Sequence, residues 1–252
     1  MNYSCKLFIK IIHYHYFLIF GMNVPFEVLY EDNHLLVVNK ASGILVQGDI
    51  TGDIPLVQLC KDYISKKYGK PGAVFLGVVH RIDRPVSGVV VLARTSKALE
   101  RMNALFREKR AKKIYWAITE QEPSTGKGTL VHWLSKDEKK NKTTAWSRET
   151  LGALRSELSY SVLVRAGNQW LLKVEPVTGR PHQIRAQLAA MGCPIKGDVK
   201  YGYPAPFEDG SIALHARKLE FIHPVRKEPL SLDAPLPDKA HWRVFSTYEK
   251  TD

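Results

Sequence analysis

Residues 80–93, HRIDRPVSGVVVLA, join a charged segment to an apolar one. Its second half, residues 89–93, is an uninterrupted apolar and mostly β-branched run, which is typical of a buried strand. Its first half, residues 80–88, carries charged side chains, a proline and a glycine, which is typical of a loop. The sequence therefore predicts a polar loop that leads directly into a strand of the core.

Short apolar runs surround this buried strand on both sides. Further strands are expected at residues 26–30, 35–39, 114–119, 160–165 and 170–175. The first two should pair about the turn-rich residues 31–33, and the last two about residues 166–168. The basic run 136–142, KDEKKNK, is expected to be a solvated hairpin tip.

Three segments carry helical patterns. Residues 54–68 place apolar side chains at helical spacing before Gly69, and residues 182–191 form a short helix that Gly192 ends. The third helix should follow a cap at Ser96, with an apolar stripe of Leu99, Met102, Leu105 and Phe106. Its outward face should consist of Arg101, Arg107, Lys109 and Arg110. Since strands outnumber helices and do not alternate with them regularly, the sequence predicts an α+β fold with a largely antiparallel mixed sheet.

The composition is that of a basic globular protein. The 252 residues include 37 Lys and Arg against 25 Asp and Glu, a net charge of +12, and 44% are hydrophobic. Such a chain is too apolar to be disordered, and its surface should attract polyanions such as nucleic acid, anionic lipid or acidic protein. The three cysteines, Cys5, Cys60 and Cys193, have neither metal-ligand nor disulfide-framework spacing, which favours a reducing compartment.

Residues 1–21 differ from the rest of the chain. They hold Lys6, Lys10 and no acid, with an apolar stretch that His13 and His15 interrupt. The stretch resembles a weak signal peptide, but no small-residue cleavage site precedes Met22, and it is too short to span a membrane. We favour a third interpretation, in which translation starts at Met22 and residues 1–21 belong to no domain. Residues 22–252 are then expected to form a single domain.

Two segments hold residues suited to chemistry. In residues 80–88, the carboxylate of Asp83 stands between Arg81 and Arg84, and positive neighbours keep an aspartate ionised. In residues 178–189, TGRPHQIRAQLA, Gly179 permits a tight turn and Arg185 falls near the start of the expected helix. Taken singly, each segment could be a solvated surface feature.

In their order along the chain, these segments resemble the RluA-type family of RNA pseudouridine synthases. HRIDRPVSG, then KKIYWA at 112–117 and GRPHQIR at 179–185, match the family patterns HRLDxxTSG, K-x-Y-x-A and GRxHQIR. Further matches are LYEDNHLLVVNKASGILV at 29–46, KGDVKYG at 196–202, IALHARKLEFIHP at 212–224 and DAPLP at 233–237. The resemblance runs from about residue 26 to residue 242 and implies that family's catalytic fold, with a central active-site cleft.

The resemblance also implies roles for individual residues. Asp83 matches the catalytic aspartate, Tyr115 the tyrosine that lines the uracil pocket, and Arg185 the arginine that pairs with the aspartate. Arg81 matches the residue that enters the RNA where the target base leaves. A further set, expected to contact RNA, is Arg84, Arg180 and His182.

The implied reaction converts a uridine of ribosomal or transfer RNA to its carbon-linked isomer without metal or organic cofactor. No phosphate-binding glycine loop or metal-ligand spacing is present in the sequence. An ionised Asp83 could attack the anomeric carbon or abstract a ribose proton to give a glycal, and the sequence does not choose between these routes. The target nucleotide must be flipped out of its stack.

Departures from the family pattern leave these residues intact. Ile82 and Val86 replace the usual leucine and threonine, and Ala41 stands where the family often has proline. The small RNA-binding domain that often precedes the catalytic domain is not expected here. The resemblance further implies a cytoplasmic protein that binds RNA and no membrane, and a monomer is the simplest expectation.

Two other functions are compatible with the same residues. One is a non-catalytic RNA-binding or ribosome-assembly protein, which a disrupted Asp83 or Arg185 would have favoured. The other is a glycosylase, since an aspartate beside a ribose can also serve hydrolysis. Glycoside hydrolysis usually uses two carboxyl groups, and neither segment holds a second acid. The sequence does not identify the RNA or the uridine that is modified.

Overall fold

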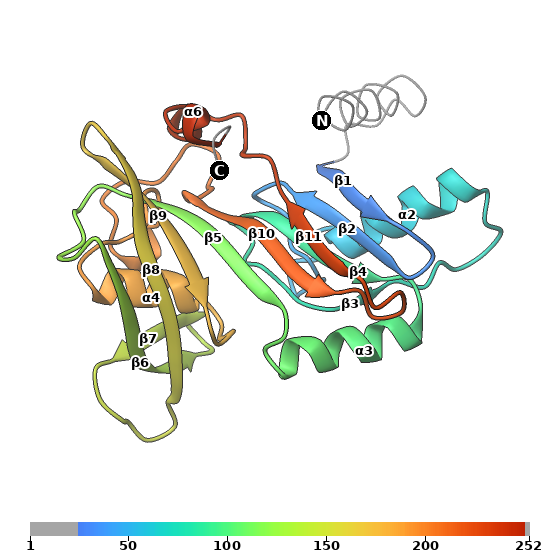
Figure 1. The fold of residues 1–252 in the computed structure, drawn as a ribbon, viewed down its shortest axis with the longest axis horizontal. Helices are drawn as coiled ribbons and strands as arrows, with labels where there is room; N and C mark the ends of the chain where they lie inside the picture. The colour runs from blue at the N-terminus through green and yellow to red at the C-terminus, as the bar shows by residue number, and fades with distance from the viewer. Residues whose placement is uncertain (1–24, 250–252) are drawn as a thin grey trace.

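The computed structural model describes residues 25–249, which form an 11-stranded sheet with helices on both faces (Figure 1). The expected extension at residues 1–21 and the start at Met22 lie outside the described residues. The strand order is β1-β2-β4-β10-β5-β9-β8-β6-β7, while β3 also pairs with β4 and β11 with β10. The pairs are antiparallel except β4 and β10, which run parallel. The predicted α+β fold with a largely antiparallel sheet is confirmed.

The strands have the following bounds: β1 Phe26–Glu31, β2 Leu35–Lys40, β3 Gly77–Val78, β4 Ser87–Ala93, β5 Lys112–Thr119, β6 Lys127–Asp137, β7 Lys142–Trp146, β8 Leu154–Ala166, β9 Gln169–Pro176, β10 Leu214–Ile222 and β11 Pro229–Asp233. The helices are α2 Leu56–Tyr68, α3 Ser96–Arg107, α4 Gln183–Ala190, the 3₁₀ turn η1 Val199–Tyr201, α5 Ala240–Arg243 and α6 Ser246–Glu249. Every strand and helix that the sequence predicted is present. The basic run 136–142 is, as expected, the tip that joins β6 to β7.

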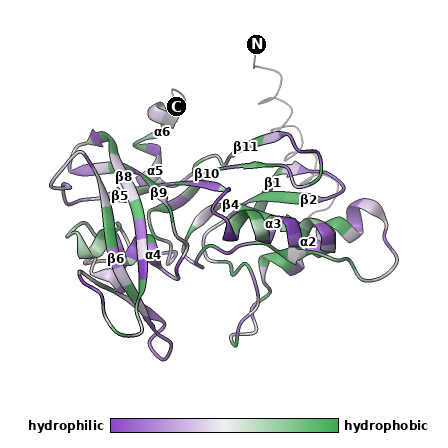
Figure 2. Ribbon diagram, turned by 60° about the horizontal axis from the view of Figure 1, so that its bottom comes forward, coloured by the Kyte–Doolittle hydropathy of each residue, from purple (hydrophilic) through white to green (hydrophobic). Residues whose placement is uncertain are grey.

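Residues 89–93 of β4 contain no polar side chain because the strand is buried on both of its faces. Its side chains alternate between two cores, and all seven residues are buried. Val90 and Leu92 pack with α2 on one face, whereas Val89, Val91 and Ala93 pack with α3 on the other. In Figure 1, α2 and α3 flank the half of the sheet around β4, and α4 covers the half around β6 to β9. Figure 2 shows the apolar residues gathered on these packed strands.

The structure of α2 and α3 differs from the sequence analysis in three places. The cap of α3 is Thr95 and not Ser96, because the Thr95 side chain accepts the Ala98 N–H at 3.2 Å. Helix α2 begins at Leu56 rather than residue 54, since Pro55 has extended backbone angles and precedes the first turn. Arg101 is not on the fully exposed face of α3, because it is half-buried and donates to the Pro224 carbonyl.

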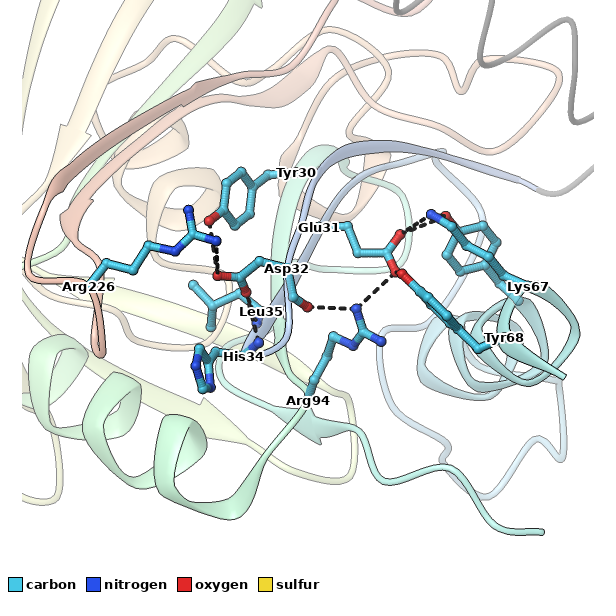
Figure 3. Close-up of polar contacts among 10 residues, drawn as sticks. Tyr30, Glu31, Asp32, His34, Leu35, Lys67, Tyr68, Arg94 and Arg226 are labelled. Atoms are coloured by element: carbon cyan, nitrogen blue, oxygen red, sulfur yellow. Dashed lines mark hydrogen bonds and ion pairs between the residues drawn. The ribbon is translucent and has the colours of Figure 1, made fainter. Parts of the chain in front are cut away.

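A cluster of polar side chains holds the turn between β1 and β2, and we call it the turn cluster (Figure 3). Asp32 Oδ1 accepts the N–H groups of His34 and Leu35, both at 2.8 Å, which closes the turn that residues 31–33 predicted. Glu31 accepts four hydrogen bonds of 2.7–2.9 Å, whose donors are Tyr63, Lys67, Tyr68 and Arg94. These donors come from α2 and from the residue after β4, so the cluster ties the edge strand to the core.

Residues 25–249 contain no helix long and apolar enough to cross a membrane. In the same residues, no three His, Cys, Asp or Glu side chains stand together as a metal-binding group. Cys60 and Cys193, the two cysteines among them, are free thiols in the interior. Burial raises the pKa of the thiol at both positions.

Candidate active site

Asp83 lies on the loop between β3 and β4, and the backbone of that loop is held from several sides. The Val86 N–H donates to the Asp83 carbonyl at 3.1 Å, which makes a turn beside Pro85. The Ile212 N–H, just before β10, donates to the Pro85 carbonyl at 3.2 Å. The Gly43 N–H donates to the Arg84 carbonyl at 2.8 Å. The aspartate is therefore presented by a fixed loop at the start of the most buried strand.

Gly88 allows this loop to meet β10. A Cβ atom at Gly88 would lie 2.3 Å from the carbonyl oxygen of Ala216, and the residue has a φ of +118°. Both facts require glycine. The preceding Ser87 shares a 2.8 Å hydrogen bond with His215 Nδ1 in the interior, which ties the parallel strands β4 and β10 together.

Arg185 is presented by α4, a short helix in which six consecutive residues, 183–188, are buried. Gln183 fixes the preceding loop: its Oε1 accepts from Thr178 Oγ1 and from the Arg180 N–H, and its Nε2 donates to the Glu157 carbonyl. The helix begins at Gln183 because His182 has a φ of +53°. The sequence placed this start at residue 182.

The loop and the helix bring Asp83 and Arg185 together across 102 residues of sequence. Arg185 Nη1 donates to Asp83 Oδ2 at 3.0 Å, and His182 Nε2 lies 3.8 Å from the same oxygen. The other oxygen, Oδ1, has no hydrogen-bond partner among residues 25–249. The Asp83 side chain is 27% exposed, whereas that of Arg185 is 6% exposed. One carboxylate oxygen is thus anchored and the other is open to a ligand.

A second carboxylate, Asp198, also binds Arg185. Arg185 Nε donates to Asp198 Oδ2 at 2.7 Å, and Nη2 donates to Oδ1 at 2.8 Å, in a bidentate pair. Burial alone disfavours the charged guanidinium, but Asp198 and Asp83 together raise the pKa of Arg185 above its usual value. Arg185 therefore stays charged in the interior, with its fork orientation set by Asp198.

Sequence reasoning missed Asp198 and the adjacent Tyr201. The Tyr201 ring lies 4.9 Å from the Arg185 guanidinium carbon, and its hydroxyl contacts His182 Nδ1 and the Thr143 N–H, both at 2.8 Å. Gly197, with φ +85°, turns the chain into Asp198 where a Cβ would lie 2.7 Å from Phe207. The signal was the motif KGDVKYG at 196–202, which was matched to the family without a role for its aspartate.

Tyr115 projects from β5 and is half-buried against the larger core. Burial raises the pKa of its hydroxyl, and the negative charge of Asp83 raises it further. The Tyr115 hydroxyl is therefore protonated at neutral pH and within electrostatic range of Asp83.

Arg81, Arg84 and Arg180 make no contact with the Asp83 carboxylate among the contacts of the described residues. Arg81 and Arg180 are exposed, and their side chains have no carboxylate partner in the described part of the chain. Arg84 pairs with Asp53 at 2.6 Å and donates to the Gly43 carbonyl at 2.9 Å. The carboxylate contacts of Asp83 come from Arg185 and His182, and neither Arg81 nor Arg84 has a contact with it among those of the described residues.

A buried lysine, Lys40, binds the backbone of the Asp83 loop, and sequence reasoning missed it as well. Lys40 is fully buried at the end of β2, and its Nζ donates to three carbonyls, those of Ala41, Ile44 and Arg84. Burial lowers the pKa of Lys40 to about 7, although Asp83 opposes the shift. Its signal was the NKASG part of the motif at 29–46.

The paired aspartate and arginine form a candidate active site on an α+β sheet, and known proteins are similar to this chain in sequence and in fold. The sequence profile of the RNA pseudouridylate synthase family matches residues 34–190. Ribosomal large subunit pseudouridine synthase C of Vibrio cholerae is 33% identical over 221 residues, which cover 83% of this chain and 65% of that protein. The chain thus spans just under two thirds of that relative's length.

Two further proteins extend the comparison. An uncharacterized RNA pseudouridine synthase of Synechocystis is 31% identical over 236 residues, 90% of this chain and 70% of that protein. The solved structure of human RNA pseudouridylate synthase domain containing 4 superimposes with a TM-score of 0.69 at 26% identity, covering 84% of this chain and 88% of that one. The chain belongs to the RNA pseudouridine synthase family, and the predicted RluA-type membership is confirmed.

Proposed function

We propose that this protein is an RNA pseudouridine synthase in which Asp83 is the catalytic carboxylate. The observation that carries the proposal is the 3.0 Å contact of Arg185 Nη1 with Asp83 Oδ2, which leaves Oδ1 without a partner among residues 25–249. Family membership supports the reaction class. The two segments that meet at this contact are those in which the family motifs occur.

The reaction needs an ionised carboxylate with an accessible oxygen. The bond from uracil nitrogen 1 to the ribose breaks, the uracil turns, carbon 5 bonds to the ribose, and the proton on carbon 5 leaves. Asp83 Oδ1 can attack the anomeric carbon, or it can remove a ribose proton to give a glycal. Both routes start from the same charged oxygen, and the geometry of the protein serves either.

Arg185 and Tyr115 complete the proposed site. Arg185 keeps Asp83 ionised when a bound nucleotide excludes water, because an unpaired carboxylate in such a site would become protonated. Tyr115 offers a flat ring against which a flipped uracil can stack. Its raised pKa keeps its proton in place at neutral pH, so that the hydroxyl serves as a hydrogen-bond donor.

Ribosomal RNA is the substrate that the comparisons favour, because the Vibrio relative carries that substrate in its name. Transfer RNA is the alternative that the sequence left open. We place the protein in the cytoplasm, where both RNAs are found, and we propose that it acts as a monomer with residues 22–252 as its single catalytic domain. Exposed Arg81 and Arg180 near Asp83 are proposed to contact the RNA, together with Arg84 and His182.

A glycosylase would need a second carboxyl group, and the second acid near Asp83, Asp198, is already paired with Arg185. Asp198 is 1% exposed on its side chain, and both of its oxygens are bound by Arg185. A hydrolase needs its second carboxyl group free to activate water or to protonate the leaving group. Asp198 in its present pair can do neither, so isomerisation is favoured over hydrolysis.

The proposal is tested by pseudouridine formation in vitro and in cells. Purified protein is incubated with total ribosomal and transfer RNA from cells that lack its gene, and pseudouridine is mapped before and after. We expect at least one uridine to lose modification in those cells and to regain it in vitro. Asp83→Asn should form no detectable pseudouridine while binding RNA as tightly as the wild type.

Two results would overturn the proposal. One is the absence of any uridine that depends on the gene, together with no product from the purified protein. The other is full activity of Asp83→Asn. If the protein binds RNA equally well with and without Asp83 and never forms product, it is instead a non-catalytic RNA-binding or ribosome-assembly protein.

A further inference from the structure

Lys113 stands between the two segments that form the proposed site. It is on β5 two residues before Tyr115, so both side chains leave the strand on the same face. Its Nζ lies 3.7 Å from the point where a Cβ on Gly179 would stand, beside Arg180. On the other side is His80, whose pKa is lowered by burial and then by the charge of Lys113.

The neighbouring lysine on the same strand shows what is unusual about Lys113. Lys112 is 55% exposed on its side chain and lies 3.4 Å from Glu175 and 3.7 Å from Glu220. Lys113 is half-buried, yet it has no carboxylate or hydrogen-bond partner in the part of the chain that the structure describes. The neighbouring strands β9 and β10 thus supply counter-ions to the exposed Lys112, whereas the half-buried Lys113 has none among the described residues.

A second cation makes this arrangement less favourable. Lys109 follows the end of α3, where its φ of +58° forms the left-handed turn into β5. Burial lowers the pKa of the Lys113 ammonium, and the like charge of Lys109 lowers it further. Stacking of His80 on Phe106, with ring centroids 4.8 Å apart, holds the Asp83 loop against the same end of α3. Lys109 thus adds a second positive charge to this region, and Lys113 has no acid to balance its own charge among the described residues.

We propose that Lys113 and Lys109 form a phosphate seat that holds a backbone phosphate of the RNA next to the nucleotide bound at Asp83. The seat is defined by these two lysines and is bordered by Gly179 and His80. An anion bound there would supply the negative charge that Lys113 lacks among the described residues. The exposed guanidinium groups of Arg81 and Arg180, one residue beyond His80 and Gly179, extend the same positive rim toward solvent.

The seat rests on the proposed function, because that function brings a polyanion to Asp83. Its position would give RNA binding a fixed register: a nucleotide anchored at Lys113 by its phosphate presents its neighbour to Tyr115 and Asp83. Phosphate contacts of this kind fix register and orientation and carry no base preference. They also release counterions, which makes their number measurable from the salt dependence of binding.

The test compares Lys113→Gln with Lys112→Gln, which removes the same charge from the same strand on its other face. Binding of a fluorescein-labelled oligouridylate is measured by anisotropy over a series of KCl concentrations. For Lys113→Gln we expect about tenfold weaker binding at low salt and a salt slope smaller by about 0.7, the value for one phosphate contact on a single strand. Lys112→Gln should match the wild-type slope.

Two more variants protect the test against a folding artefact. Lys113→Arg keeps the charge and should restore the slope. Lys109→Asn, chosen because asparagine tolerates a positive φ, should also weaken binding. The double variant Lys109→Asn with Lys113→Gln should lose less than the sum of the single losses if both lysines hold one phosphate. Lys113→Gln should melt at or above the wild-type temperature, since it removes an unpaired half-buried charge.

The proposal is overturned if Lys113→Gln keeps the wild-type slope, or if Lys112→Gln lowers the slope by the same amount. Pseudouridine formation by the wild type is a separate measurement. Product formation with an unchanged slope in Lys113→Gln refutes the seat and leaves the proposed function standing. A reduced slope without any product from the wild type supports the seat as an RNA contact and refutes the proposed function.

Discussion

The turn cluster and the active site use the same residue types in opposite ways. Glu31 and Asp32 are 8% and 5% exposed on their side chains, and each of their four carboxylate oxygens receives at least one donor (Figure 3). Asp83 is 27% exposed and is contacted on Oδ2 alone, by Arg185 and at longer range by His182. Partners for both oxygens fix a carboxylate in place, whereas partners for one oxygen leave the other able to react.

The arginines differ in the same sense. Arg94 in the turn cluster donates from Nη1 to both Glu31 and the Asp32 carbonyl, and it joins the end of β4 to the turn between β1 and β2. Arg185 donates from Nε and Nη2 to Asp198 and from Nη1 to Asp83. Asp198 thus serves the site as a structural acid. The comparison predicts that structural acids control stability and that Asp83 controls turnover, and four measurements test it.

The largest loss of stability should follow Asp198→Asn. The change leaves the buried guanidinium of Arg185 with only the half-exposed Asp83 as a counter-ion, and breaking a buried pair costs about 3 kcal/mol. Urea unfolding should give that decrease in the free energy of unfolding. Pseudouridine formation should fall as well, because Arg185 loses the partner that orients it. A variant as stable and as active as the wild type would remove Asp198 from the site.

A smaller loss is expected for Glu31→Gln. An amide nitrogen cannot accept a hydrogen bond, so two of the four donors around Glu31 lose their acceptor and the other two face a neutral oxygen, at a cost of about 2 kcal/mol. Activity at a temperature where the variant is folded should equal that of the wild type. Glu27→Gln on the same strand is the control, since Glu27 has no partner among the described residues. A selective loss of activity in Glu31→Gln would contradict the comparison.

The turn cluster should also make stability fall in acid. Burial alone would raise the pKa values of Glu31 and Asp32, but hydrogen bonds hold them below the ordinary 4.5 and 3.8. A lowered pKa in the folded state contributes stability above the unfolded value, and that contribution is lost as the pH falls through the folded value. Unfolding measured below about pH 4.5 should therefore lose stability more steeply in the wild type than in Glu31→Gln. Equal slopes would contradict this role for the cluster.

The smallest effect on stability should be that of Asp83→Asn. Its side chain is partly exposed and only one of its oxygens is bound, so the change should stay within about 0.5 kcal/mol. The same variant is expected to form no pseudouridine. A loss of several kcal/mol on urea unfolding would mean that Asp83 is a structural acid like Glu31.

Much of the fold followed from local sequence, and the errors were local as well. The apolar run at 89–93 and the turn residues at 31–33 predicted a buried strand and a hairpin, and both are present. The cap of α3 was wrong by one residue because Thr95 and Ser96 can both cap, and only the hydrogen bond to the Ala98 N–H distinguishes them. Residue type alone makes Thr95 and Ser96 equally good candidates for the helix cap.

The resemblance to the family carried the candidate site further than the residues did. It brought Asp83, Tyr115 and Arg185 to one place, and the structure sets Arg185 against Asp83. It supplied motifs for Lys40 and Asp198 but no role for either residue. Both side chains are buried, and the sequence alone does not say which charged residues are buried.

From the sequence alone we predicted the strands β1, β2, β4, β5, β8 and β9, the helices α2 to α4, the polar loop before β4 and the family to which the chain belongs, but not β3, β10 or β11. Periodicity, turn residues and motifs are local properties, and neighbouring residues encode them. Only the tertiary structure decided which oxygen of Asp83 is bound, which acid orients Arg185, and which of two adjacent lysines has no counter-ion. These depend on side chains brought together from distant segments, because hydrogen bonds and ion pairs act over a few ångströms whatever the separation along the chain.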